Sequence, residues 1–167
     1  MTEVNSNYAN VAGRETSPDS LLGALWWADV QGRLLQQRVD LVAHFALADA
    51  GGLGMLDSLE PRSIYAVFVL YAQLRGELVE STATPASLRV YAARRSDGEL
   101  AVLVVNTAPV ALPAEVELRW PGADERRLTT WLLDATHRDL QPSSPERVLN
   151  RFSHLVPPRS VYLLRLA

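Results

Sequence analysis

Hydrophobic residues follow a helical period over much of the first part of the chain. Between residues 20 and 37, apolar side chains recur at three- and four-residue spacing, which predicts an amphipathic helix. Ser17 and Pro18 precede this pattern and suit an N-cap and a first helical position. A second helical pattern, rich in apolar residues, runs over residues 60–75.

The segment between these two patterns has a different character. Residues 39–48, VDLVAHFALA, are apolar apart from Asp40 and His44 and have no polar face. Such a run predicts a strand covered on both sides, as in a parallel sheet with helices outside. Residues 49–57 form a glycine-rich turn, and residues 1–8 suit the end of an earlier strand. The order predicted before Gly76 is therefore strand, helix, strand, helix.

After Gly76 the hydrophobic period changes to two. Residues 87–95 and 99–107 alternate and flank Asp97-Gly98, which predicts a β-hairpin. Further strands are expected at residues 114–120, 127–134 and 160–166. Strands at this spacing, with Pro and Gly turns between them, predict an antiparallel β-sandwich.

Composition excludes several classes of partner and site. The net charge is −3 and the pI about 5.6, whereas nucleic-acid binding requires a basic face, so no nucleic-acid partner is expected. No stretch approaches the roughly 20 apolar residues of a membrane span. The chain has no cysteine, and His137 and His154 lack a spaced carboxylate partner, so neither a metal site nor a cofactor is predicted.

Two strand–helix units are too few to close a parallel barrel, which takes about eight strands. The segments TEVNSNY, GALWWADVQGRLLQQRVDLVAHFALADAGGLGMLD and EPRSIYAVFVLYAQL resemble the C-terminal part of a retaining clan A glycoside hydrolase. The most similar groups are those of the arabinofuranosidases, xylosidases and endoglucanases. The resemblance implies an α/β part followed by an all-β part. Residues 1–76 would be the end of a (β/α)8 catalytic barrel, and residues 77–167 an antiparallel β-sandwich domain that ends in PPRSVYLLRL.

The resemblance also implies roles for three residues. Glu3 matches the family's nucleophile, which forms a covalent glycosyl-enzyme that water then hydrolyses. Asn5 lies two residues on, hence on the same side of a strand, and is expected to position the substrate or the carboxylate. His44 and Phe45 point to opposite faces of their strand, and Phe45 is the one expected to contact the sugar.

Other readings of these residues remain open. A glutamate near an N-terminus is more often simply solvated, and His44 is more often a hydrogen-bonded core histidine than a substrate contact. Trp26 and Trp27 lie in a helix that should cover the sheet, so at least one is expected to pack. Asp49 precedes glycines, where it suits a turn former as well as a ligand contact.

The family's general acid/base is expected in an Asn-Glu pair after the fourth barrel strand, which this sequence does not contain. Neither Glu15 nor Glu60 occupies that position. We therefore expect a C-terminal portion of a glycoside hydrolase that carries the nucleophile but is inactive alone. Its partners would be a carbohydrate substrate and either a missing N-terminal barrel portion or a second copy, because an unpaired strand edge promotes association. The alternative is a stand-alone β-sandwich module for carbohydrate binding or protein interaction.

Overall fold

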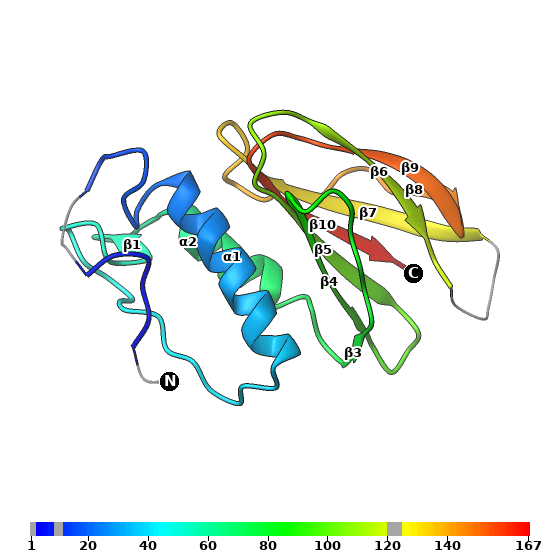
Figure 1. Ribbon diagram of the computed structural model, residues 1–167, viewed down its shortest axis with the longest axis horizontal. Helices are drawn as coiled ribbons and strands as arrows, with labels where there is room; N and C mark the ends of the chain where they lie inside the picture. The colour runs from blue at the N-terminus through cyan, green and yellow to red at the C-terminus, as the bar shows by residue number, and fades with distance from the viewer. Residues whose placement is uncertain (1–2, 9–11, 120–124) are drawn as a thin grey trace. The chain divides into compact units, whose positions relative to one another are not determined.

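The computed structural model describes residues 3–8, 12–119 and 125–167 (Figure 1). It divides into two compact units, Met1–Val69 and Leu70–Ala167. The first contains helix α1 (Leu21–Gln36), the two-residue strands β1 (Leu56–Asp57) and β2 (Glu60–Pro61), and most of helix α2 (Ser63–Tyr71). The second contains strands β3 to β10.

Helix α1 forms where the periodicity predicts it, but its cap is different. Ser20 is the N-cap, and its hydroxyl accepts a hydrogen bond from the Gly23 N–H at 3.0 Å. Ser17, the predicted cap, is buried one turn earlier, where its hydroxyl donates to the Arg14 carbonyl at 2.7 Å. The prediction was wrong because the Ser20 N–H donates to the Ser17 carbonyl, which forms a turn before the helix.

The start of helix α2 was also predicted too early. Glu60 and Pro61 form β2, which pairs antiparallel with β1, and the helix begins only at Ser63. Ser58 has a positive φ of 56° in the connecting turn. The hairpin precedes the helix because the Arg62 N–H donates to the Met55 carbonyl at 2.9 Å, which keeps this part of the chain extended.

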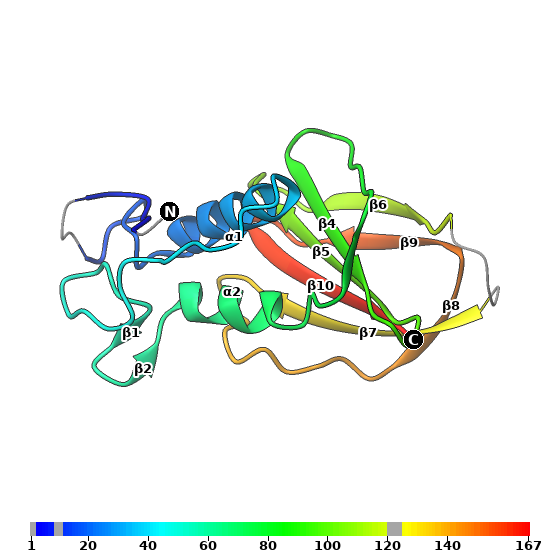
Figure 2. The same ribbon diagram turned by 90° about the horizontal axis from the view of Figure 1, so that it is seen from below.

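Residues 39–48 do not form the continuous, doubly buried strand that their apolar run predicts. The structure has isolated parallel bridges at His44, to Val4, and at Ala48, to Leu56. Leu41 is 71% exposed and Leu47 is 62% exposed. A ladder needs a neighbouring backbone at each residue, and among the described residues the Val4 segment supplies one rung only. Figure 2 shows α1 and α2 running in the same direction. The chain that connects them, which includes residues 39–48, therefore runs back the opposite way.

The hairpin of the second unit is confirmed. Strands β4 (Leu88–Arg94) and β5 (Leu100–Asn106) pair antiparallel, and the turn between them has Gly98 at a φ of 88°. Only a residue without a Cβ adopts this conformation at little cost. The Asp97 carboxylate accepts from the Glu99 N–H at 3.0 Å, which further stabilises the turn.

Two antiparallel sheets make up the second unit. The larger has the order β3-β4-β5-β10-β7-β8, in which β3 is Glu77–Val79, β7 is Glu125–Leu133, β8 is Glu146–Leu149 and β10 is Ser160–Leu166. The smaller pairs β6 (Leu112–Glu117) with β9 (Arg151–Val156), and Figure 1 shows it as a second layer. The buried cluster at the centre draws on both: Leu88, Ala92, Val102, Val104, Leu128, Val156, Leu164 and Leu166.

The predicted strands match this unit in part. Residues 160–166 coincide with β10, and residues 127–134 overlap β7. The strand predicted at residues 114–120 corresponds to β6, although its predicted end, Trp120, lies outside the described residues. Strands β3, β8 and β9 were not predicted, because short strands with exposed charged residues give a weak alternation.

Asn106 joins the two sheets at one end of the unit. Its side chain is fully buried, and its Nδ2 donates to the carbonyls of Val110 at 3.0 Å and Pro157 at 2.8 Å. Its Oδ1 accepts from the Ala108 N–H at 2.9 Å. One amide therefore satisfies polar backbone groups that follow both β5 and β9, groups that would otherwise be buried without partners.

We expect Asn106→Ala to lower the free energy of unfolding by about 2–4 kcal/mol, because each buried polar group left unpaired costs about 1–3 kcal/mol. Urea unfolding followed by circular dichroism measures this. Thr107→Ala, at the exposed neighbouring position, is the matched control and should change stability by less than about 1 kcal/mol. Equal effects of the two substitutions would contradict the role given to Asn106.

Candidate functional site

A single parallel rung joins the two segments that carry the predicted site. The Val4 N–H donates to the Ala43 carbonyl at 3.0 Å, and the Phe45 N–H donates to the Val4 carbonyl at 3.0 Å. This is the hydrogen-bond pattern of parallel strands with Val4 beside His44. It therefore aligns Glu3 with Ala43 and Asn5 with Phe45.

The rung also determines which side chains share a face. Side chains alternate along an extended backbone, so Val4 and His44 lie on one side and Glu3, Asn5 and Phe45 on the other. Exposure agrees with this division, because Glu3 is exposed and Phe45 is 44% exposed. On the opposite side, the His44 ring packs against Trp27 of α1 and Phe68 of α2, with ring centroids 4.9 Å and 6.0 Å away.

Asn5 connects this segment to the chain beyond Phe45. Its Nδ2 donates to the Phe45 carbonyl and, at 3.0 Å, to the Leu53 carbonyl. Its Oδ1 accepts from the Ser6 N–H at 2.7 Å. The amide thus bonds to backbone groups, and it fixes the position of Phe45 relative to the Glu3 segment. Its predicted contact with a substrate remains a prediction.

The glycine-rich loop after Phe45 is held by backbone pairing. The Ala46 N–H donates to the Leu53 carbonyl at 3.1 Å, and the Met55 N–H donates to the Ala46 carbonyl at 2.9 Å. Gly54 approaches the backbone so closely that a Cβ there would lie 2.3 Å from the Asp49 nitrogen. The Asp49 carboxylate accepts from the Leu53 N–H at 3.0 Å. Of the two roles considered for Asp49, turn former and ligand contact, this hydrogen bond corresponds to the turn former.

Arg62 is a residue of this region that the sequence analysis missed. One of its guanidinium nitrogens donates to the carbonyls of Asp49 at 2.8 Å and Gly54 at 3.0 Å, and another lies 3.4 Å from the Asp57 carboxylate. The side chain is only 10% exposed. An arginine that follows Pro61 carries no sequence signal for such a role, because its partners are backbone carbonyls.

His44 is part of an aromatic cluster rather than the hydrogen-bonded core histidine that was the alternative. Neither ring nitrogen has a hydrogen-bond partner among the described residues. Burial lowers the pKa of His44 from 6.5 to about 4, because the charged imidazolium would lose its water, and the Ala46 backbone offsets part of this effect. The neutral ring contributes to packing, as does Trp27, which is fully buried.

The face that carries Glu3 thus presents a carboxylate, an amide and an aromatic ring. The rung brings no second carboxylate to Glu3, and retaining hydrolysis requires two, about 5–5.5 Å apart. Among the described residues, no group of three or more His, Asp or Glu side chains is arranged to hold a metal ion. No helix in the described part of the chain is long and apolar enough to cross a membrane.

Solved structures resemble the chain over almost its whole length. A family 30 endoxylanase from Clostridium papyrosolvens matches 99% of this chain and 41% of its own, with a TM-score of 0.78 and 16% identity. A family 44 xyloglucanase from Paenibacillus polymyxa matches 100% of this chain and 31% of its own, with a TM-score of 0.76 and 22% identity. CelM2, a bifunctional glucanase-xylanase from a metagenome library, matches 99% of this chain and 30% of its own, with a TM-score of 0.74 and 23% identity.

The chain has the fold of the C-terminal region of a glycoside hydrolase. It spans less than half the length of each of these three enzymes. No protein-family model and no curated protein sequence matches it. The likeness to glycoside hydrolases that the sequence motifs indicated is therefore confirmed at the level of the fold, and the roles of Glu3, Asn5 and Phe45 remain predictions.

We expect the burial of His44 to make stability depend on pH. Its folded pKa of about 4 lies below the ordinary 6.5, so the unfolded chain binds a proton between these values and the folded chain does not. Stability should therefore fall as the pH falls from about 6.5 to about 4. Allowing for the partial exposure of the ring, we expect a loss of about 1–2 kcal/mol from this residue.

Urea unfolding of His44→Phe at pH 7 and pH 4.5 tests this expectation. The variant keeps an aromatic ring between Trp27 and Phe68 and should lose less stability on acidification than the wild type. If His44→Phe loses as much stability as the wild type, the assignment is wrong.

Proposed function

We propose that this chain is the C-terminal portion of a retaining glycoside hydrolase that acts on plant-type polysaccharides or oligosaccharides. The observation that supports this most is the parallel rung between Val4 and His44, in a chain with the fold of a glycoside hydrolase C-terminal region. Active-site residues of β/α barrels lie at the C-terminal ends of parallel strands. Glu3, Asn5 and Phe45 share one face at such a pairing.

In this proposal, the Glu3 carboxylate attacks the anomeric carbon as the bond to the leaving group breaks. The product is a covalent glycosyl-enzyme, and water then displaces Glu3 and regenerates the carboxylate. Phe45 is exposed beside Asn5 and offers an apolar ring to the sugar. Asn5 acts mainly as a positioning residue, because its amide is bonded to the carbonyls of Phe45 and Leu53.

A complete site needs a second carboxylic acid to protonate the leaving-group oxygen. We propose that this group comes from an N-terminal barrel portion. This chain covers only 41% and 31% of two of the neighbouring structures, which leaves room for such a portion in a longer protein. General acid catalysis contributes about 10²- to 10⁴-fold. The barrel portion would also supply most of the surface that binds the sugar.

The exposed apolar residues of the first unit support such a partner. Leu41, Ala43, Phe45 and Leu47 are exposed and form an apolar stripe along a segment whose strand pairing consists of isolated parallel bridges at His44 and Ala48. Additional parallel strands would pair with this backbone and cover the stripe. In the absence of the barrel portion, a second copy of the chain is the partner that we propose.

The purified 167-residue chain should not hydrolyse aryl glycosides of xylose, arabinofuranose or glucose above the uncatalysed rate. This should hold even for dinitrophenyl glycosides, whose leaving group needs no protonation, because most of the sugar-binding surface is missing. Initial rates measured by absorbance test this, with the Glu3→Gln chain as the matched control. Robust turnover by the wild type that Glu3→Gln abolishes would show that the chain is a complete enzyme.

A second candidate function is a stand-alone carbohydrate-binding or interaction module. It is favoured by the second unit, whose two sheets enclose a buried cluster of their own. In that case binding should depend on residues of the sandwich and be unchanged in Glu3→Gln.

A further inference from the structure

Trp131 of β7 is a large apolar side chain that the second unit buries only in part. Two neighbours on the same face of the larger sheet, Leu133 and Leu163, are completely buried. Trp131 therefore lies where the apolar part of this face meets solvent. An indole ring at such a border offers an apolar surface to a ligand, and tryptophan is enriched in binding sites for this reason.

The guanidinium group of Arg165 covers one face of the ring. Arg165 belongs to the neighbouring strand, β10, and its Cζ lies 5.3 Å from the centre of the Trp131 ring. Its Nε lies 3.1 Å from the Glu99 carboxylate, and one of its Nη atoms donates to the Gln73 Oε1 at 3.4 Å. An ion pair, a hydrogen bond and a cation–π contact thus hold the guanidinium in place beside the ring.

The other face of the ring is directed toward the edge of the sheet. On that side of β7, strand β8 pairs only with residues 125–128, so none of the described strands lies beside Trp131 there. The neighbouring chain is at Ser143, an exposed residue whose N–H donates to the Thr130 carbonyl at 2.8 Å. With one face held and the other directed toward exposed chain, the ring is prepared for a flat ligand at little cost in ordering.

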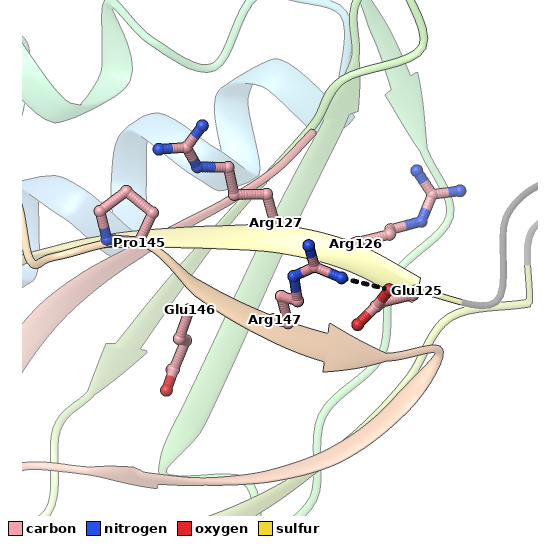
Figure 3. A pocket seen from close by; sticks show the side chains of 6 residues that line it. All are labelled: Glu125, Arg126, Arg127, Pro145, Glu146 and Arg147. Atoms are coloured by element: carbon pink, nitrogen blue, oxygen red, sulfur yellow. Dashed lines mark hydrogen bonds and ion pairs between the residues drawn. The ribbon is translucent and has the colours of Figure 1, made fainter.

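Polar side chains extend from the ring along the same face of the sheet. Side chains alternate along a strand, so Thr129 and Arg127 share the face of Trp131. Thr129 is partly exposed and lies directly opposite Arg165 in the strand register. Figure 3 shows Arg127 extending away from the ion pair at the β7–β8 edge. A hydroxyl and guanidinium N–H groups therefore accompany the apolar ring.

This combination of groups indicates the class of ligand. The C–H groups on the face of a pyranose pack on an aromatic ring, whose face is electron-rich. The sugar hydroxyls then bond to polar groups around the ring. Arg165 already has a carboxylate partner in Glu99, so the site does not depend on a charged ligand.

We propose that Trp131 and the polar side chains beside it bind a neutral pyranose unit of a polysaccharide. The site belongs to the second unit and includes no residue of the proposed active site. The choice of xylan or glucan as the polysaccharide rests on the proposed function, whereas stacking on the ring rests on Trp131 and Arg165 alone.

NMR spectra of the ¹⁵N-labelled full chain test the proposal through the indole N–H signals. The sequence has four tryptophans, and the signal missing from Trp131→Phe identifies that of Trp131. Titration with xylohexaose or cellohexaose should shift this signal saturably and leave that of the buried Trp27 in place. Added salt should not change the affinity, because a neutral ligand carries no charge to be screened. An unmoved Trp131 signal with either saccharide at about 10 mM would overturn the proposal.

Mannitol is the control for stacking, because it has hydroxyl groups but no ring. At the same concentration it should leave the Trp131 signal unchanged. A shift as large as that caused by the hexasaccharides would contradict stacking on the indole.

Variants of the chain, compared by affinity electrophoresis in gels with soluble xylan or glucan, locate the site. Trp131→Ala should lose the retardation, whereas Trp26→Ala, which removes a partly exposed tryptophan of the first unit, should keep it. Thr129→Val preserves side-chain size and should weaken binding about three- to tenfold, which tests the site even if Trp131→Ala fails to fold. Glu3→Gln should bind as the wild type does, so a failed nucleophile assignment leaves this result unaffected. Wild-type retardation of folded Trp131→Ala, or of Thr129→Val, would contradict the proposal.

Discussion

Two backbone hydrogen bonds, from Val4 to Ala43 and from Phe45 to Val4, determine the geometry of the candidate active site. They hold two segments about 40 positions apart in sequence in parallel register. Because side chains alternate, this register directs His44 toward Trp27 and Phe68 and leaves Glu3, Asn5 and Phe45 together on the other face. A shift of one residue would exchange the two faces and bury the carboxylate against the helices.

The remainder of the first unit supports this rung from both sides. Behind it, His44 is kept neutral by burial and fills the space between two aromatic rings. In front of it, Asn5 and Arg62 bond to carbonyls of residues 45–54 and fix the loop that follows Phe45. The apolar stripe differs from this supported face, because Leu41 and Leu47 are largely exposed to solvent. This combination of an ordered face and an uncovered stripe is what we expect of part of a larger barrel.

The sequence predicted the features that depend on local pattern. Helix α1, the hairpin around Gly98 and strand β10 follow from periodicity and turn chemistry, and the Glu3 motif indicated the fold that the comparisons support. Hydrogen-bond partners distant in sequence were not predictable. Ser17 has the sequence context of an N-cap, but the hydrogen bond from the Ser20 N–H to the Ser17 carbonyl places it in a turn before the helix. Residues 39–48 have the composition of a buried strand, yet a strand also needs neighbours, which composition does not report.

The proposed glycosidase is tested most directly by determining the coding sequence upstream of Met1 and expressing the longest in-frame chain that ends at Ala167. We predict further strand–helix repeats with an Asn-Glu pair, and an enzyme whose aryl-glycoside hydrolysis falls at least about 1,000-fold in Glu3→Gln. In a Glu3→Ala chain, whose truncated side chain leaves room for an anion, azide should restore turnover by attacking the anomeric carbon as the leaving group departs, giving the glycosyl azide. A stop codon and ribosome-binding site immediately before Met1, or a Glu3→Gln enzyme with wild-type activity, would contradict this proposal.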